Sequence, residues 1–489
     1  MSLVTLEQVS LAFGHVALLD HVNFRLEAGE RVAVIGRNGE GKSSLLQLIS
    51  GDLSPDDGRI ERRAVTLARL AQESELEGQQ TVFHAVAAGL GHLGQLAEDY
   101  HTLTQRLAHQ PNDEALLKQL EHIQQQLEAQ GGWQLEQRVE IILSRLQLPA
   151  TERLATLSGG WRRRVTLAQA LVRAPEVLLL DEPTNHLDMT TIAWLEELLI
   201  HDFQGGLIFV THDRHFLQRL ATRIVELDRG QLTSYPGDYA TYVRTKEATL
   251  AAQAQHAAQF DKVLAQEEQW IRQGIKARRH RNQGRVRALE QLRIQRAQRR
   301  ERQGQINLNV AQGPLSGRLV IVAEQLSYAY QGKAIVHNFS TTILRGDKIG
   351  IIGDNGIGKT TLLKLLLKEM APHAGRVDHG SQLHIAYFDQ LRAQLEPNAT
   401  VVDTVAQGRE QISINGQHKH VMAYLQDFLF APERARSPVK ALSGGERNRL
   451  LLAKLFTQPA NVLVLDEPTN DLDIESLELL ETLLIDYQG

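Results

Sequence analysis

Two lysines of this chain each follow a glycine-rich loop with the spacing GxxxxGK[ST], which is suited to holding phosphate. Glycines let the backbone wrap closely around phosphate oxygens, and the helix that follows adds its positive end. Each lysine is expected to contact β- and γ-phosphates. The residues expected to bind a nucleoside triphosphate are Gly36, Arg37, Asn38, Gly39, Glu40, Gly41, Lys42, Ser43 and Ser44 in the first loop, and Gly353, Asp354, Asn355, Gly356, Ile357, Gly358, Lys359, Thr360 and Thr361 in the second.

An Asp-Glu pair follows each loop further along the chain, within the sequence Asp-Glu-Pro-Thr-Asn. Hydroxyl and carboxylate oxygens suit Mg²⁺, and a glutamate one residue further on can polarise the attacking water. The expected metal ligands are Ser43, Asp181, Thr360 and Asp466, and the expected catalytic glutamates are Glu182 and Glu467. Because the combination occurs twice, chance is a poor explanation, and the sequence predicts an ATPase that uses ATP and Mg²⁺.

Short apolar runs predict the strands that position these residues. Residues 31–35 and 348–352 lead into the two glycine loops, and residues 177–180 and 462–465 end at the Asp-Glu pairs. Such runs are typical of buried strands in parallel sheets, whose ligands lie at the carboxyl ends of the strands. We therefore expect an α/β fold class with two tandem P-loop ATPase domains.

The two copies of the motif set differ in length. The glycine loops are 317 residues apart, whereas two Leu-Ser-Gly-Gly sequences, at 157–160 and 442–445, are 285 apart, so the first copy is longer by 32 residues. The extra length falls at about 94–131, where apolar residues recur at helical spacing on both sides of Gln110-Pro111. We expect an inserted helical arm there, and a plain surface elaboration of the domain stays open as the alternative.

Length and composition indicate a globular protein of two or more domains, and the cysteine content suits a reducing cytosol. Its 489 residues, of which 42% are apolar, exceed what one hydrophobic core usually supports. There is no cysteine, no apolar run of 18 residues and no secretion signal at the N-terminus. We expect no membrane span and a cytoplasmic location.

A net charge of −5 hides a basic block between the two copies. Residues 272–302 contain twelve Lys or Arg and two Glu, so the rest of the chain sums to −15. Residues 246–303 lack proline and predict a long helix, with Gly274 and Gly284 bracketing its most basic part. A solvated, salt-bridged helix face is the alternative, but two acids cannot pair twelve bases. Nucleic acid is the expected partner, through Arg272, Lys276, Arg278, Arg279, Arg281, Arg285 and Arg287.

We therefore expect three parts along the chain. They are a first ATPase domain at 1–243 that carries the helical arm, a basic helical linker at 244–312, and a second ATPase domain at 313–489. Residues 304–317 have the glycine, proline and serine content of a loop that leads into the second domain.

Together these motifs resemble the ATP-binding cassette (ABC) family over nearly the whole chain. The decisive motif is Leu-Ser-Gly-Gly, which generic P-loop ATPases lack. In that family it caps the nucleotide of the other half. The resemblance therefore implies that Ser158 and Gly160 complete the site of Lys359, and that the corresponding Ser443 and Gly445 complete the site of Lys42. A serine hydroxyl and glycine amides at a helix start suit an anion. The implied arrangement is an intramolecular pairing of two cassettes.

The same resemblance assigns further residues. It implies two glutamines that sense Mg²⁺ and γ-phosphate, two aromatic rings that stack on adenine, two aspartates across the interface and one switch histidine that contacts γ-phosphate. These are Gln72 and Gln390, Phe13 and Tyr330, Asp188 and Asp473, and His212. Plain core packing is the alternative for the aromatic residues, and a purely structural role is the alternative for the histidine.

Two departures from the family pattern affect the second site. Trp161 follows the first Leu-Ser-Gly-Gly where Gln or Glu is common, and Glu446 follows the second. An indole there leaves phosphate contact by Ser158 open but is expected to alter closure of the second site. The counterpart of His212 would fall seven or eight residues after Gly489, so we expect a truncated second cassette with doubtful hydrolysis.

Two cassettes, no predicted membrane span and a charged helical linker resemble the ABC-F class. Residues 270–293 and the Gly-Trp signature are similar to the Uup subgroup. This implies a ribosome partner, with ATP-driven closure moving the linker against rRNA or tRNA. The subgroup is also associated with branched DNA, largely through a C-terminal coiled coil that we do not expect within these residues, and ATP-dependent binding of branched DNA is the first alternative. A motor subunit of a membrane transporter is the last, because it gives the basic block no role.

Overall fold

The computed structural model describes most of the chain: residues 2–13, 16–63, 66–70, 80–91, 94, 96, 100, 103–104, 107, 113–129, 133–157, 159–185, 187–273, 316–330, 332–388, 395–414, 417–442, 444–470 and 472–489. Several predicted site residues lie outside the described residues: Gln72, Ser158, Lys276, Arg278, Arg279, Arg281, Arg285, Arg287, Gln390 and Ser443, together with the side chain of Arg272.

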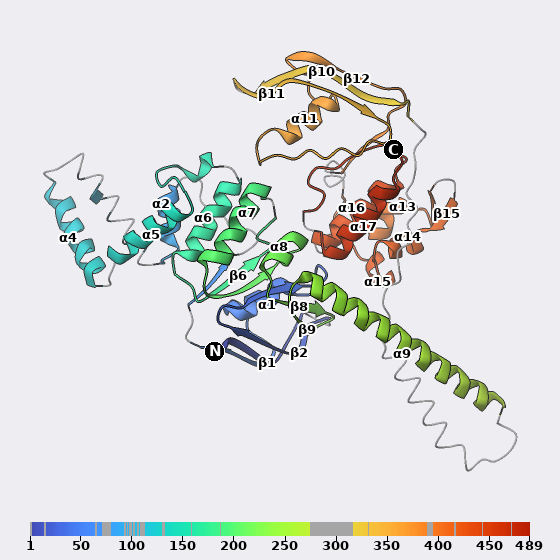
Figure 1. Cartoon of the computed structure of the whole chain (residues 1–489), viewed down its shortest axis with the longest axis horizontal. Helices are drawn as coiled ribbons and strands as arrows, with labels where there is room; N and C mark the ends of the chain where they lie inside the picture. Colours follow the sequence, from blue (N-terminus) through green and yellow to red (C-terminus); the bar gives the residue numbers. More distant parts are fainter. Residues whose placement is uncertain are drawn as a thin grey trace, which may run out of the picture.

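A six-stranded sheet lies at the centre of the first half (Figure 1). Its order is β5-β6-β7-β3-β8-β9, parallel except for β9. The strands are β3 (Arg31–Ile35), β5 (Leu67–Leu70), β6 (Val177–Asp181), β7 (Gly206–Val210), β8 (Arg223–Asp228) and β9 (Gln231–Pro236). The strands predicted at 31–35 and 177–180 are thus confirmed, and each ends where a predicted site begins.

Side chains of β3 alternate between two cores because the sheet is covered on both faces. Val32 and Val34 pack with the antiparallel sheet β2-β1-β4 and helix α1, whereas Ala33 and Ile35 pack with helices. The first layer contains β1 (Ser2–Phe13), β2 (Val16–Glu27), α1 (Lys42–Ser50) and β4 (Asp57–Arg62). The second contains α2 (Val82–Ala88), α5 (Trp133–Arg145), η1 (Leu154–Thr156), α6 (Gly159–Leu171), α7 (Met189–Glu197), η2 (Leu198–Asp202) and α8 (Arg214–Leu220).

Two helices project from the first half (Figure 1). Helix α4 (Glu114–Ala129) lies within the range of the predicted arm. Helix α9 (Tyr239–Gln273) begins soon after β9, inside the range assigned to the first domain, and its 35 residues extend about 50 Å. Among the described helices, none is long and apolar enough to cross a membrane.

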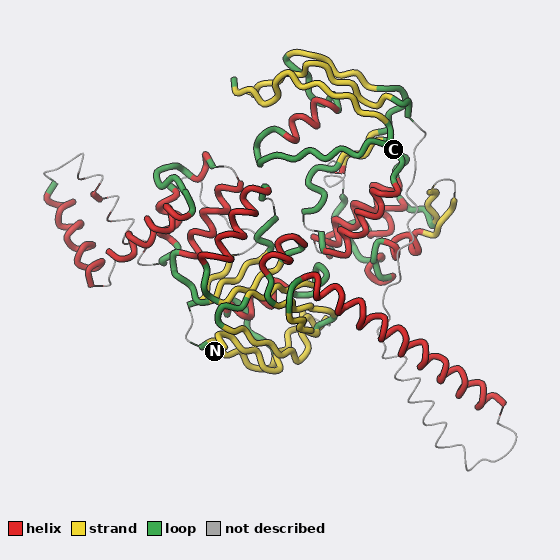
Figure 2. The backbone as a smooth tube through the Cα atoms, in the orientation of Figure 1, coloured by secondary structure: helices red, strands yellow, loops and turns green. Residues whose placement is uncertain are grey.

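The second half has two layers as well (Figure 2). An antiparallel sheet, β11-β10-β12, packs on α11, and a parallel pair, β13-β16, lies beside a helical core. The elements are β10 (Leu319–Tyr330), β11 (Lys333–Leu344), α11 (Lys359–Leu366), β12 (Ala374–His379), β13 (Ile385–Tyr387), α13 (Val401–Ala406), β14 (Gln411–Ile414), β15 (Gln417–His420), α14 (Val421–Asp427), α15 (Pro432–Ala435), η3 (Val439–Ala441), α16 (Gly444–Thr457), β16 (Val462–Val464) and α17 (Ile474–Asp486). Strand β16 confirms the prediction at 462–465.

The strand predicted at 348–352 is not formed, and that prediction was wrong. Three isoleucines of the segment are exposed, Ile352 by 81%. In the first half the matching strand, β3, lies between β7 and β8, which follow the Asp-Glu pair. Among the described residues of the second half, no strand follows β16 as β7 and β8 follow β6. An apolar run becomes a strand only when neighbours supply its hydrogen bonds, and the described residues supply none here.

Candidate active sites where the two halves meet

The first glycine loop holds the side chain of its own lysine. Nζ of Lys42 donates hydrogen bonds to the carbonyl oxygens of Gly36 (2.8 Å) and Arg37 (3.1 Å) and to Oδ1 of Asn38 (3.2 Å). Gly41, just before α1, has a φ of 100°, which residues with a side chain rarely adopt. Burial lowers the pKa of Lys42, and nearby carboxylates oppose that shift. The ammonium group therefore lies at the positive end of α1, where phosphate oxygens can replace the loop carbonyls.

The second loop repeats this geometry with a different sequence. Nζ of Lys359 donates to the carbonyl oxygens of Gly353 (2.7 Å) and Asp354 (3.2 Å) and to Oδ1 of Asn355 (3.5 Å). Gly358 has a φ of 112°. The glycine spacing, rather than the residues between the glycines, determines the loop conformation.

A hydroxyl and a carboxylate lie together beside each loop. Oγ1 of Thr360 donates to Oδ2 of Asp466 over 3.0 Å, and Ser43 hydrogen-bonds to Asp181. Burial raises the pKa of Asp181, while Ser43 and Lys42 lower it. Mg²⁺ prefers oxygen donors and is commonly bound by one or two such residues together with substrate phosphates. The chemistry of these donors fits the predicted role of the four residues.

Glu182 and His212 meet at the first site. Nε2 of His212 lies 3.2 Å from Oε1 of Glu182 and 3.3 Å from Oδ1 of Asn38. Burial lowers the pKa of His212, and Lys42 lowers it further, so the imidazole is neutral near pH 7. Glu182 and Glu467 have φ values of 46° and 44°, a strained conformation that is common at functional sites. The backbone at both glutamates is therefore not extended, unlike that of the strand before each of them.

The first loop lies against the second half of the chain. The backbone N–H of Asn38 donates to Oδ2 of Asp473 over 3.1 Å, and Nε of Arg37 lies 2.8 Å from Oε2 of Glu475. Burial alone would raise the pKa of Asp473, but an adjacent arginine and several hydrogen bonds lower it to about 2. Gly445 lies so close that an added Cβ would clash with the side chain of Asn38. The second signature therefore contacts the first loop directly.

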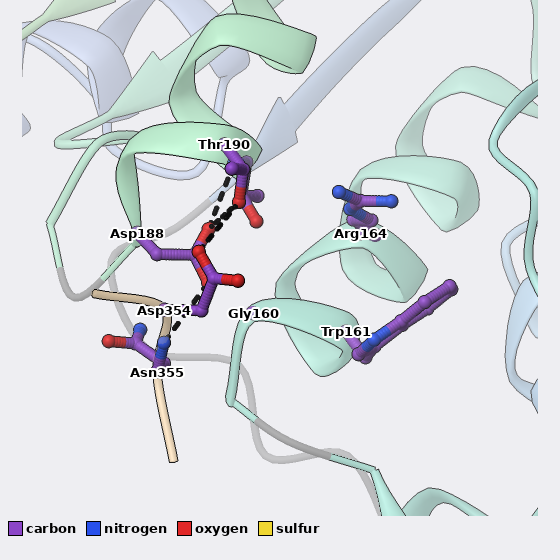
Figure 3. A pocket seen from close by; sticks show the side chains of 8 residues that line it. Gly160, Trp161, Arg164, Asp188, Thr190, Asp354 and Asn355 are labelled. Carbon is purple, nitrogen blue, oxygen red and sulfur yellow. Dashed lines mark hydrogen bonds between the residues drawn. The ribbon is translucent and has the colours of Figure 1, made fainter. Parts of the chain in front are cut away.

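The second loop lies against the first half through equivalent residues. The backbone N–H of Asn355 donates to Oδ2 of Asp188 over 3.3 Å, and Oγ1 of Thr190 donates to Oδ1 of Asp354 over 3.4 Å. Figure 3 shows these residues beside Gly160, and together they line a cavity of about 180 Å³. Each signature helix thus lies at the phosphate loop of the other half.

The two crossed contacts differ in their details. The guanidinium of Arg164 lies 5.0 Å from the ring of Trp161 and 4.7 Å from that of Trp194, and Trp161 borders the cavity at the second loop. At the equivalent position of the other signature, Glu446 forms an ion pair with Arg434 at 2.8 Å. The indole of Trp161 therefore stacks within its own half, next to the cavity at the second loop.

The predicted adenine-stacking residues lie on the surface. Phe13 is 58% exposed and Tyr330 is 61% exposed, each at the end of its strand. The alternative of plain core aromatics is therefore wrong for both, and stacking on adenine stays a prediction.

Sequence reasoning missed residues that join the halves. Glu475 pairs with Arg37, and Arg214 lies near Glu478 and Glu481. The three glutamates recur every third residue in α17, a spacing visible in the sequence, but nothing local indicates their partners.

Comparisons with known proteins follow the same division of the chain. A family model described as "ABC transporter" matches residues 19–185 and 336–470, and a second model with that description matches residues 225–308. Over its full length the chain is 53% identical to ATP-binding protein Uup of Haemophilus influenzae, covering 75% of that protein, and 49% identical to Uup of Escherichia coli, covering 77%. It is 36% identical over 99% of its length to the energy-dependent translational throttle protein EttA of Mycobacterium tuberculosis, covering 87%.

Proposed function

Because this chain belongs to the Uup group of the ABC-F class of ATP-binding cassette ATPases, we propose that ATP-driven closure of its two cassettes moves the linker between them against ribosomal RNA or tRNA. In this proposal the first cassette, predicted at 1–243, comprises the described residues up to the end of β9 at Pro236, and the second, predicted at 313–489, comprises those from Ser316 onward. In this proposal the protein acts in the cytoplasm on ribosomes, with Mg²⁺ bound beside each ATP.

The observation that carries the proposal is the crossed contact of each phosphate loop with the other cassette. Asp473 accepts a hydrogen bond from the first loop, and Asp188 accepts one from the second. A triphosphate bound between a loop and the opposing signature would gain ligands from both cassettes. A ligand shifts an equilibrium only by binding one state better than the other, and this arrangement makes the closed state that better binder.

Each residue has a definite task in the proposed hydrolysis. Lys42 and Lys359 hold the β- and γ-phosphates, and Mg²⁺ neutralises charge that develops on them. Glu182 and Glu467 accept a proton from the attacking water, an effect worth typically about 10²–10⁴-fold. The neutral imidazole of His212 donates to the γ-phosphate from Nε2, the ring nitrogen that lies nearest to Glu182 and Asn38.

The basic linker is the part of the chain that fits nucleic acid. Its guanidinium groups can pair with phosphates and stack on bases, and the acids nearby are too few to neutralise them. The name of the EttA relative refers to translation, which favours RNA of the ribosome over other polyanions.

A double substitution tests the proposal. Glu182→Gln with Glu467→Gln removes the proton acceptors but leaves the loops intact, so ATP should bind and trap the closed form. We expect this variant to co-sediment with ribosomes in ATP, whereas a Lys42→Ala, Lys359→Ala control, which loses phosphate contacts, should not. Equal co-sedimentation of the two variants would refute the ribosomal function.

Branched DNA is the second candidate, because the same basic linker fits any nucleic acid backbone. Junction DNA and ribosomes should therefore compete for the trapped variant at equal salt, since phosphate contacts make both affinities salt-dependent. Preference for junction DNA would favour ATP-dependent binding of branched DNA as the function. A transporter motor predicts copurification with a membrane partner, and it leaves the basic linker without a role.

A further inference from the structure

Helix α8 follows the switch histidine without a break. Asp213 caps this helix by accepting hydrogen bonds from the backbone N–H groups of His215 (2.9 Å) and Phe216 (3.1 Å). Phe216 is fully buried in the core of the first cassette. Because the cap and the core contact fix the helix to the segment before it, a shift of His212 is carried into α8.

The first residue of α8 reaches the second cassette. Nη2 of Arg214 lies 3.3 Å from Oε1 of Glu478, and Nη1 lies 3.5 Å from Oε2 of Glu481. Burial raises the pKa of Glu478, neighbouring Glu475 and Glu481 raise it further, and Arg214 lowers it. Glu475, Glu478 and Glu481 form an acidic face of α17, and Arg214 partly compensates its negative charge.

Helix α8 also contacts the N-terminal end of linker helix α9, residues 238–240, which we call the root of α9. Nε2 of Gln218 donates to Oδ2 of Asp238 over 2.7 Å, and the backbone N–H of Ala240 donates to Oε1 of the same glutamine over 2.9 Å. Burial raises the pKa of Tyr239, and the positive charge of nearby Arg214 lowers it. The guanidinium of Arg214 thus lies near both α17 of the second cassette and the first residue of α9.

The next turns of α9 are fixed to the first cassette. Glu226 of β8 accepts hydrogen bonds from the hydroxyl of Tyr242 (3.1 Å) and from Nζ of Lys246 (2.5 Å). The rings of Tyr235 and Tyr242 pack edge to face with centroids 5.1 Å apart. With its root held in this way, α9 moves as a lever, and a turn of about 10° at the root would displace its far end by roughly 9 Å.

We propose that Arg214 is a positioning residue that couples the first ATP site and the second cassette to the direction of linker helix α9. The inference deepens the proposed function, on whose linker movement it rests. When ATP draws the cassettes together, α17 and the segment that contains His212 move. Arg214 transmits both movements to Tyr239 at the root of the linker helix.

Spin labels on the intact chain test this coupling without ribosomes. The chain has no cysteine, so Lys262→Cys on α9 and Glu433→Cys on α15, both exposed, give a unique label pair. In the Glu182→Gln, Glu467→Gln background we expect ATP to produce one narrow, shifted distance. Arg214→Gln should broaden that distribution and remove its dependence on ATP. In the hydrolysing protein it should lower kcat on the order of fivefold with KM unchanged.

Arg219→Gln is the matched control. Arg219 lies on the same helix but pairs with Glu196 (2.9 Å) and Glu197 (3.0 Å) inside the first cassette, so its loss should leave the distance narrow. Arg214→Lys, which keeps the charge, should restore part of the ATP response. A wild-type distance distribution in Arg214→Gln, or equal broadening in Arg219→Gln, would overturn the inference. Because no ribosome is present, failure of the ribosomal function leaves this result unaffected.

Discussion

Single residues make the two ATP sites unequal although their loops have the same backbone. Glu40 of the first loop corresponds to Ile357 of the second, and Arg37 corresponds to Asp354. Burial raises the pKa of Glu40 to about 7, with a further contribution from Asp228. The carboxyl group of Glu40 therefore changes its charge near neutral pH within a loop built for phosphate.

This difference predicts a pH dependence of the first site. Above pH 7 the ionised Glu40 repels the triphosphate, so ATP affinity should fall by up to about tenfold between pH 7 and pH 8. Glu40→Gln removes that charge and should abolish the added decrease. Titration with ATP in a Lys359→Ala background, which silences the second site, measures the first site alone.

Glu40→Gln should also change the free energy of unfolding of the protein, in a direction that depends on pH through the same raised pKa. The folded pKa of Glu40 lies above the unfolded value, so its contribution is present below pH 4.5 and lost as the pH rises through 7. Glu40→Gln should therefore stabilise the nucleotide-free protein more at pH 8 than at pH 5. Parallel ATP affinities of the wild type and the variant across pH 6 to 8 would contradict this account of Glu40.

Motif spacing predicted the positions of the charged groups but not all of their contacts. Ser43 comes together with Asp181 because both motifs of the first half lie at the ends of strands, β3 and β6, whereas in the second half only Asp466 follows a strand, β16. The pairing of Arg37 with Glu475 crosses between cassettes, so no local pattern announces it. The roles of Gln72, Gln390 and the adenine-stacking aromatics stay predictions.

At the scale of elements, the signature helices differ in how closely they approach the opposing loop. Gly445, at the start of α16, contacts Asn38 in the first loop, whereas Gly160, at the start of α6, borders a cavity. The segment at 348–352, which was predicted as a strand, shows a limit of the apolar pattern. Its apolar pattern matches β3, but a strand needs paired neighbours, which the sequence pattern of one segment cannot supply.

The two signature glycines provide a matched pair of substitutions. In Gly445→Ala the new Cβ would lie 2.5 Å from Cβ of Asn38, so one of the two elements must move. In Gly160→Ala the nearest atom, Oγ1 of Thr191, is 3.5 Å away, which is ordinary contact. Overpacking costs about 1–3 kcal/mol, so we expect Gly445→Ala to lower ATPase kcat by about fivefold or more and Gly160→Ala by less than twofold. The reverse order in steady-state assays would contradict the crossed packing.

The whole molecule combines an acidic pair of cassettes with a basic linker. A repeated motif set on one chain, together with the family resemblance, predicted that the cassettes pair within the molecule, and the contacts of Asp188 and Asp473 agree with that prediction. The difference between the two crossed contacts was harder to predict from the sequence. It depends on the stacking of Trp161, Arg164 and Trp194 and on the pairing of Arg37 with Glu475, which exist only once distant segments have packed.

The central claim is that each phosphate loop meets the opposite cassette, and cysteine cross-linking tests it most directly. In this cysteine-free chain, Arg37→Cys with Glu475→Cys, and separately Thr190→Cys with Asp354→Cys, can be treated with a short bis-maleimide. Single-cysteine variants serve as controls. The crossed arrangement predicts that both pairs form an intramolecular product whose yield rises with ATP in the Glu182→Gln, Glu467→Gln background. No product from either pair, with ATP bound, would contradict it.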